Sequence, residues 1–140
     1  MDVRAIYLPG LAMVVLTAVV WFRMYTMRIG QMKRERIHPQ KVATSAQASA
    51  LLTDSRAADN FRNLFELPVL FYFALVVADR IGRVDMLSVG LAWLFVALRI
   101  AHSGIHVTYN KVMHRFMTYV AGGVVLWLLW AYLAIGLFSR

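Results

Sequence analysis

The chain has 140 residues, of which 61% are hydrophobic and 16% are charged, and it contains no cysteine. Soluble domains are about 45–50% apolar and about 25% charged, so this composition argues against a soluble globular protein. It also excludes a disordered chain, a disulfide scaffold, a zinc–cysteine site and a cysteine nucleophile. The length leaves room for one domain of about four membrane spans.

The first span is predicted over about residues 5–25. No charged residue occurs between Ile6 and Phe22, and the run ends in Trp21, Phe22 and Arg23, an aromatic and basic edge typical of a bilayer interface. The run is longer than the apolar core of a secretory signal peptide, and no small-x-small cleavage motif follows it. We therefore expect this segment to stay in the protein as a membrane helix.

A polar segment follows from Arg28 to Asp59, and its middle, residues 43–50, consists largely of Ala, Ser, Thr and Gln. This composition predicts a loop with a helical part and does not suggest a second domain. Residues 1–140 are therefore expected to form a single membrane domain.

Two further apolar runs, Leu67 to Ala78 and Met86 to Leu98, are too short to cross a bilayer unless polar residues extend each helix. Extended in this way, the second and third spans are predicted over about residues 60–79 and 84–104. The fourth span is predicted over about residues 115–138. The sequence thus predicts an all-α fold, an integral membrane four-helix bundle.

The basic residues divide unequally between the two ends of such a bundle. Four lie near the termini or the second connection, namely Arg4, Arg80, Arg83 and Arg140, whereas the other eleven flank the first and third connections. Lysine and arginine concentrate on the cytoplasmic side of membrane proteins. We therefore expect the first and third connections in the cytoplasm and both termini outside. The net charge of +8 is interpreted as topological, able to attract anionic headgroups or substrates, and not as a nucleic-acid surface.

Polar side chains form a stripe near one end of each of the last three helices. The spacing within the stripes of the second and third helices is three, four and three residues, and the two members on the fourth helix are four residues apart, so each stripe lies on one helix face. The stripes share one membrane face, and they consist of Arg56, Asp59, Asn63 and Glu66, then Arg99, His102, His106 and Tyr109, then Arg115 and Tyr119.

Ionisable residues within a span cost about 2.5–3.5 kcal/mol each on insertion scales, so they face protein or a watery cavity. One interpretation is helix-to-helix pairing, with Arg62 bound to Glu66 or Asp59, Asp59 bound to Arg99, and His102 bound to a backbone carbonyl. The other is an anion-binding pocket, because the residues gather at one depth with an excess of arginine. No phosphate loop, HExxH motif or GxSxG elbow is present, and no metal site is predicted.

The run from Arg62 to Phe71 contains Asn63 and Glu66 three residues apart, followed by Pro-x-x-Phe. This run resembles the second-helix signature of the MAPEG family, the membrane-associated proteins in eicosanoid and glutathione metabolism. Arg56 lies ten residues before Glu66, where members of the family carry an arginine.

The end of the third helix and the start of the fourth carry a further resemblance. Arg99 and His102 lie in the stretch from Ala97 to His102, Arg115 follows Arg99 by sixteen residues, and Tyr119 follows four residues later. This arrangement resembles the prostaglandin E synthase branch of the family. Together with the predicted four spans and the long basic first connection, the resemblance covers the full chain.

The resemblance implies a homotrimer in the lipid bilayer, with glutathione held as a co-substrate between neighbouring subunits near the cytoplasmic face. It implies that Glu66 holds the α-amino group of glutathione and that Asn63 positions the peptide. Arg62 and Arg99 would pair with the carboxylates. The remaining members of the stripes are expected to line the same pocket: Arg56, His102, His106 and Tyr109.

The resemblance assigns the chemistry to Arg115 and Tyr119. A guanidinium at the start of a helix adds its charge to the positive end of the helix dipole, and both lower the pKa of a nearby thiol. Tyr119, one turn further on, could donate a hydrogen bond to the sulfur. An apolar small-molecule substrate would arrive from the bilayer through a groove between helices.

The chain departs from the eicosanoid-forming members at two positions. Asp59 stands where they have an arginine, and His106 stands where they have a tyrosine, with Tyr109 on the same helix face. Three hypotheses follow from the residues and the resemblance. The first is a glutathione-dependent transferase or peroxidase acting on apolar electrophiles or lipid hydroperoxides. The second is the same scaffold binding another small anion, and the third is a non-catalytic membrane protein whose polar cluster is structural.

Overall fold

The structure, a computed structural model, describes residues 2–139, and these residues form helices joined by short connections, with no strand among them. This confirms the predicted all-α fold. In chain order the helices are the 3-10 helix η1 (Val3–Ile6), α1 (Tyr7–Arg34), the 3-10 helix η2 (Pro39–Val42), α2 (Ser45–Leu51), α3 (Arg56–Asn63), α4 (Leu67–Arg80), α5 (Met86–Val107) and α6 (Val112–Phe138).

Four segments of the described chain are long and apolar enough to cross a membrane: Val3–Arg34, Arg56–Arg80, Met86–Val107 and Val112–Phe138. Their outer surfaces carry many exposed large apolar side chains, such as Leu11 and Phe22 on α1 and Phe73 on α4. A soluble protein does not expose apolar surface on this scale, whereas a lipid-facing surface requires it. The chain is therefore an integral, multi-pass membrane protein built as a four-helix bundle.

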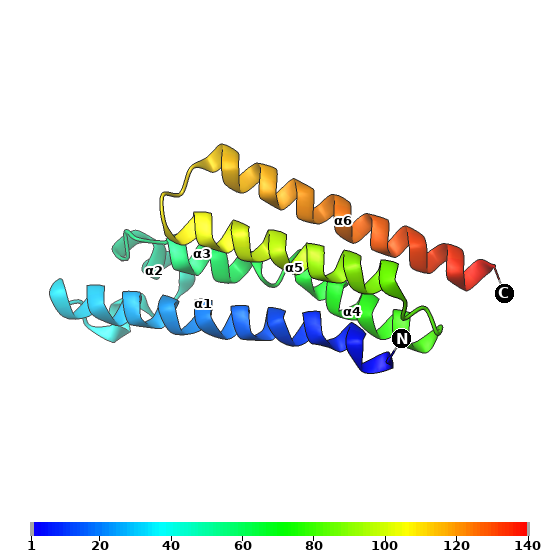
Figure 1. Cartoon of the computed structure of the whole chain (residues 1–140). Helices are drawn as coiled ribbons and strands as arrows, with labels where there is room; N and C mark the ends of the chain where they lie inside the picture. The colour runs from blue at the N-terminus through cyan, green and yellow to red at the C-terminus, as the bar shows by residue number, and fades with distance from the viewer. Residues whose placement is uncertain (1, 140) are drawn as a thin grey trace.

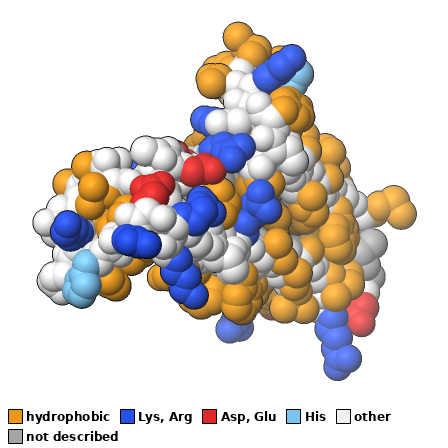
Figure 2. All heavy atoms as spheres, turned by 90° about the vertical axis from the view of Figure 1, so that its left-hand side faces the viewer, with side chains coloured by type: hydrophobic (Ala, Val, Ile, Leu, Met, Phe, Trp, Pro, Cys, Tyr) orange, Lys and Arg blue, Asp and Glu red, His pale blue; other side chains and the backbone are white. Residues whose placement is uncertain are grey.

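Both chain termini lie at the same end of the bundle, and the connection between α5 and α6 lies at the opposite end with α2 (Figure 1). We call these the terminal end and the loop end. Viewed from the loop end, the surface carries many lysine and arginine side chains (Figure 2). The uneven charge of the sequence is thus gathered on one end of the fold.

The first helix is longer than the sequence predicted. Residues 28–34 were expected to begin a loop, but α1 continues to Arg34. A helix can extend beyond the apolar run because its last turns leave the bilayer, where polar side chains such as Gln31 and Lys33 are solvated or paired. Lys33 and Arg34 occupy the last turn, where positive charge is favourable beside the negative end of the helix dipole.

The second span is interrupted between α3 and α4. Leu64, Phe65 and Glu66 separate the two helices, and Glu66 has the non-helical angles φ −91° and ψ −103°. Pro68 explains the interruption, because proline has no N–H to donate to the carbonyl of Leu64 and its ring clashes with that carbonyl in a continuous helix. At the interruption the carbonyl of Asn63 accepts a long bond of 3.4 Å from the Glu66 backbone N–H, so it can also accept from a side chain of another helix.

The core is formed by apolar residues from all four spans. The rings of Phe71 on α4 and Phe95 on α5 stack with centroids 4.5 Å apart, and both side chains are fully buried. Gly10 allows α1 to approach α4 closely, since a Cβ at this position would lie 2.9 Å from Cδ1 of Leu75. The core runs along the bundle to Leu126 and Leu133 of α6.

The terminal end is held by polar contacts between the α4–α5 connection and α6. The hydroxyl of Tyr132 donates a hydrogen bond to Asp85, and Arg83 reaches both the Tyr132 hydroxyl at 3.4 Å and Ser139 Oγ at 3.3 Å. Asp85 also caps the N-terminus of α5 through the backbone N–H of Ser88 at 2.9 Å. We call Arg83, Asp85, Tyr132 and Ser139 the terminal clasp.

Candidate functional site

Polar groups from the end of α3, from the interruption of the second span, from α5 and from α6 meet at one place. The hydroxyl of Tyr119 donates a hydrogen bond of 2.9 Å to Glu66 Oε2. The guanidinium of Arg99 donates to the Asn63 carbonyl at 2.8 Å, and its Cζ lies 5.6 Å from the centroid of the Tyr119 ring. Four of the predicted site residues, Asn63, Glu66, Arg99 and Tyr119, therefore form one connected group.

Arg99 is fully buried although it is charged. Its contacts explain how it can be placed there: the carbonyl that it binds is one that the helix interruption has freed, and the face of Tyr119 offers a cation–π contact. These contacts use only part of the guanidinium, because Nε and Nη1 have no hydrogen-bond partner among the described residues. Arg99 thus retains donors that could bind an anion.

His102 packs beside Tyr119, with ring centroids 5.8 Å apart. Its Nδ1 lies 3.1 Å from the Arg115 carbonyl and 3.4 Å from Thr118 Oγ1. A carbonyl can only accept a hydrogen bond, so this contact requires the proton on Nδ1. The expected bond between His102 and a backbone carbonyl is confirmed, and it ties α5 to the first turns of α6.

His106 lies one turn beyond His102, with ring centroids 5.8 Å apart, and is almost fully buried. Neither of its ring nitrogens has a hydrogen-bond partner among the described residues. The same is true of His102 Nε2, Asn60 Nδ2 and Arg115 Nε. Buried polar atoms in proteins are nearly always paired, so this concentration of nitrogens, together with those of Arg99, marks a region suited to hydrogen-bond acceptors.

Arg115 lies in the first turn of α6, where the helix dipole is positive. Its Nη1 donates a hydrogen bond of 2.6 Å to Asn110 Oδ1, and its side chain is half-buried. The carbonyl of Arg115 binds His102, so its backbone is fixed against α5. This arrangement places a positive charge one turn before Tyr119 on α6.

Three predicted site residues make their contacts elsewhere at the loop end. Arg56 binds the carboxylate of Asp54 with both Nε and Nη2, at 2.9 and 2.8 Å, and so holds the pKa of that carboxyl below its usual range. Arg62 is largely exposed and lies 3.8 Å from Asp59, rather than pairing with Glu66. Tyr109 is exposed, and its hydroxyl lies 3.1 Å from Nδ1 of His114.

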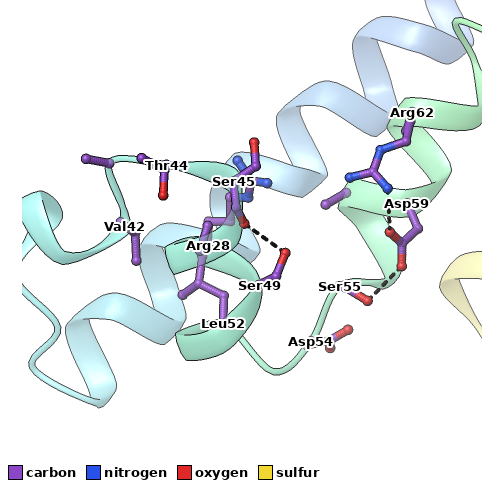
Figure 3. A pocket seen from close by; sticks show the side chains of 13 residues that line it. Arg28, Val42, Thr44, Ser45, Ser49, Leu52, Asp54, Ser55, Asp59 and Arg62 are labelled. Atoms are coloured by element: carbon purple, nitrogen blue, oxygen red, sulfur yellow. Dashed lines mark hydrogen bonds and ion pairs between the residues drawn. The ribbon is translucent and has the colours of Figure 1, made fainter.

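The expected pairing of Asp59 with Arg99 is also wrong, because Asp59 accepts a hydrogen bond of 2.7 Å from Ser55 and lies beside Arg62. Ser55, Asp59 and Arg62 line a cavity of about 220 Å³ between α1, α2 and α3, which Figure 3 shows from close by. The charge reversal at position 59 is thus accommodated in a separate cavity at the loop end.

Sequence reasoning missed a buried pair beneath the group. Ser103 Oγ donates a hydrogen bond of 3.0 Å to Asn60 Oδ1, and both side chains are buried. Each residue lies four positions after a predicted site residue, Arg56 or Arg99, so helical spacing alone could have identified them. Both are neutral polar residues, which join helices in a membrane at less cost than ionisable ones, so their presence in the sequence is a weaker signal of a site.

No group of three or more His, Asp or Glu side chains in residues 2–139 is placed to hold a metal ion. The site combines both charges: the guanidinium groups of Arg99 and Arg115 can bind an anion, and the carboxylate of Glu66 can bind a cation.

Comparison with known proteins gives one match. The model of the MAPEG family matches residues 6–135, which is nearly the whole chain. No curated protein and no solved structure matches the chain.

Proposed function

This chain belongs to the MAPEG family, and from that premise we propose that it is a glutathione-dependent membrane transferase or peroxidase that acts on apolar electrophiles or lipid hydroperoxides. The observation that carries the proposal is the connected group of Asn63, Glu66, Arg99 and Tyr119 at the interruption of the second span. It joins three helices at one point and combines a carboxylate with unpaired guanidinium donors.

The residues fit the charges of glutathione, which carries one ammonium and two carboxylates. Glu66 is exposed at the surface of the single chain and can accept the ammonium. Arg62 is largely exposed and free to turn toward a carboxylate, while Arg99 offers its unpaired donors from within the bundle. Asn63 can bond the peptide, and Arg56, His102, His106 and Tyr109 are proposed as the surrounding residues.

Glutathione supplies a thiol, which the chain itself lacks because it has no cysteine. Arg115 favours the thiolate over the thiol by its own charge and by its place at the positive end of α6. In a transfer, the sulfur forms a bond to an electrophilic carbon and the leaving group departs with the bonding electrons. In a peroxidase reaction, two thiols are oxidised to a disulfide while the hydroperoxide is reduced to an alcohol and water.

We propose a homotrimer, as the family membership suggests, with the start of α6 as one of its contact surfaces. Val112, Met113, Phe116 and Met117 surround Arg115 in the first turns of this helix, and each is at least 60% exposed in the single chain. A neighbouring subunit packed against these apolar residues would cover Arg115 and Glu66 and complete a pocket between subunits. We further propose that the loop end faces the cytoplasm, because it carries the basic excess (Figure 2).

Equilibrium binding of glutathione to the detergent-solubilised protein, measured by calorimetry, tests the proposal. We expect saturable binding that Glu66→Gln weakens by at least about tenfold, because the substitution removes a charged partner of the ammonium. Glu35→Gln is the matched control, since Glu35 is the one other glutamate in the sequence and lies at the end of α1. Failure of the folded wild-type protein to bind millimolar glutathione would contradict the proposal.

Turnover of an activated aryl halide and of a fatty-acid hydroperoxide tests the role of Arg115. We expect Arg115→Ala to lower both rates by about 100-fold, the size of effect seen when one stabilising group is removed from an anionic transition state. Arg80→Ala, at the terminal end, is the control and should be active. If Arg115→Ala instead disrupts assembly or folding, the polar cluster is structural and the third hypothesis is favoured.

A further inference from the structure

The cavity at the loop end has both charges on its walls. It lies between the end of α1, the segment of η2 and α2, and the start of α3 (Figure 3). Its walls carry two guanidinium groups, two carboxylates and several hydroxyl groups, and the lining residues are Arg28, Val42, Ala43, Thr44, Ser45, Ala48, Ser49, Leu52, Asp54, Ser55, Ala58, Asp59 and Arg62. The charges of the lining sum to zero, so the cavity suits a neutral zwitterion better than a simple anion.

Arg28 is the group in this cavity that lacks a partner. Its side chain is half-buried, and it makes no hydrogen bond or ion pair with another described residue. Asp54, in contrast, is held by Arg56, and Asp59 accepts from Ser55 and lies 3.8 Å from Arg62. A half-buried, unpaired guanidinium favours a phosphate or carboxylate, and Asp59 lies in the same cavity to receive a cation.

An apolar groove also lies between α1 and the second span. We call the line along which α1 packs against the second span, with the groove and the cavity on it, the seam. It has a volume of about 520 Å³ and is lined almost entirely by apolar atoms, from Val14, Thr17, Ala18, Trp21, Phe61, Leu64, Phe65 and Tyr72. Within the membrane, such a groove is open to lipid.

Residues of the groove and of the cavity follow one another along two helices. On α1, Val14, Trp21 and Arg28 lie at intervals of seven residues and so on one face, with Arg28 about 10 Å beyond Trp21 along the helix axis. On α3, Phe61 of the groove lies between Ala58 and Arg62 of the cavity. An amphiphile in this seam would place its chain against Trp21 and its head beside Arg28.

We propose that this seam binds a membrane phospholipid whose head is zwitterionic and carries a primary ammonium, as in phosphatidylethanolamine. Arg28 binds the phosphate, Asp59 binds the ammonium, and one acyl chain lies in the groove beside Trp21. The volume of the cavity is below the roughly 300–1,000 Å³ of pockets for whole drug-sized ligands, which suits a headgroup alone. A lipid with net negative charge would face both carboxylates, so the charges select against it.

Fluorescence quenching of Trp21 by brominated lipid tests the proposal. Substituting Trp93, Trp127 and Trp130 with phenylalanine leaves Trp21 as the single tryptophan, since the sequence contains four. The protein is placed in vesicles of unbrominated phosphatidylglycerol that contain a few per cent of lipid with brominated acyl chains. We expect brominated phosphatidylethanolamine to quench with an apparent affinity about tenfold above that of brominated phosphatidylglycerol, and brominated phosphatidylcholine to lie between them.

Arg28→Gln and Asp59→Asn, made separately in this background, are each expected to reduce the preference for phosphatidylethanolamine at least fivefold. Lys33→Gln is the matched control, because it removes one positive charge near the end of α1 from a residue outside the cavity. Circular dichroism checks that each variant is folded. Arg28→Gln removes the partner of the phosphate, and Asp59→Asn removes the partner of the ammonium. Because the test does not use glutathione, its outcome is independent of whether the protein has the proposed activity.

Two results would overturn the proposal. Equal quenching by brominated phosphatidylethanolamine and phosphatidylglycerol would mean that the groove makes ordinary contacts with bilayer lipid. Absence of quenching by either lipid in the folded protein would mean that another copy of the chain covers the groove.

Discussion

The two ends of the bundle use polar side chains in opposite ways. At the terminal end, Arg83, Asp85 and Tyr132 bind one another, so the charges and the hydroxyl of the clasp are paired. At the loop end, Arg99 and His106 are buried more deeply than any residue of the clasp, yet several of their nitrogens have no partner among the described residues. The polar side chains of the loop end therefore lower the stability of the fold more than those of the terminal end do.

This difference separates a structural contact from a candidate site. Removing an unpaired polar atom from water lowers stability, because no new bond replaces its hydration. A cluster that served only to join helices would be expected to resemble the terminal clasp. The unpaired donors around Arg99 therefore favour a ligand-binding role for the loop end, and the following predictions test that contrast.

The largest expected effect is on activity, from Arg99→Met. The substitution removes the unpaired donors, so we expect glutathione-dependent turnover to fall by about 100-fold. Stability should be unchanged or higher, since replacing a poorly paired buried charge by an apolar side chain is often neutral or stabilising. Thermal unfolding of the detergent-solubilised protein, measured together with turnover, distinguishes a loss of activity from a loss of stability. A large loss of stability would mean that Arg99 is mainly structural.

Tyr132→Phe should show the opposite pattern. It removes the hydroxyl that donates to Asp85 and accepts from Arg83, so we expect a loss of about 1–2 kcal/mol of stability. Glutathione binding should not change, because the clasp lies at the other end of the bundle. Denaturant unfolding and calorimetry check the two expectations, and weaker binding at equal folded fraction would show that the ends are coupled.

Gly136→Ala should weaken the clasp by a smaller amount. A Cβ at this position would lie 2.6 Å from Nε of Arg83, so the arginine must move and lose part of its bonding. We expect a loss of up to about 1 kcal/mol. Gly104→Ala is the matched control, because a Cβ there meets nothing within 4 Å, and alanine is the better helix former. Equal unfolding temperatures for the two variants would contradict the role assigned to Arg83.

The smallest expected effect is the pH dependence of the clasp. Partial burial acts to raise the pKa of Asp85, but hydrogen bonds from the Ser88 backbone and Tyr132 outweigh it, and the pKa is lowered overall. A lowered pKa stabilises the fold above the unfolded value of about 3.9, and this contribution is lost as pH falls through the folded value. The stability difference between wild type and Asp85→Asn should therefore shrink below about pH 4, measured by thermal unfolding. A difference that is constant from pH 7 to pH 3 would contradict this.

Much of the fold was predictable from the sequence. Uninterrupted apolar runs identified the first and fourth spans, and the need for membrane length placed polar residues within the second and third. The end of α1 was not predicted, because hydropathy marks where the bilayer ends and a helix can continue into water. The interruption at Glu66 depends on Pro68, a local signal that is present in the sequence.

For the site, helical spacing correctly grouped residues within each helix but did not determine their partners. Arg62 was within reach of two acidic residues on its own helix, and the fold pairs it with Asp59. Tyr109 shares a predicted stripe with His106, but the helix ends at Val107, so Tyr109 projects into the connection beside His114. A stripe is defined by one helix, whereas a pair across helices depends on their separation and rotation.

The sequence by itself determined the class of the protein: an all-α membrane bundle with one basic end, in the family that its motifs resemble. Composition and local spacing are sufficient for this, because transfer of each segment into a bilayer depends on that segment alone. Only the tertiary structure decided that Arg99 meets the Asn63 carbonyl and Tyr119, and that Asp59 lies in a separate cavity. It also decided that this cavity and an apolar groove are both lined by residues of α1 and α3. These contacts join residues that are distant in sequence, and the packing of the helices brings them together.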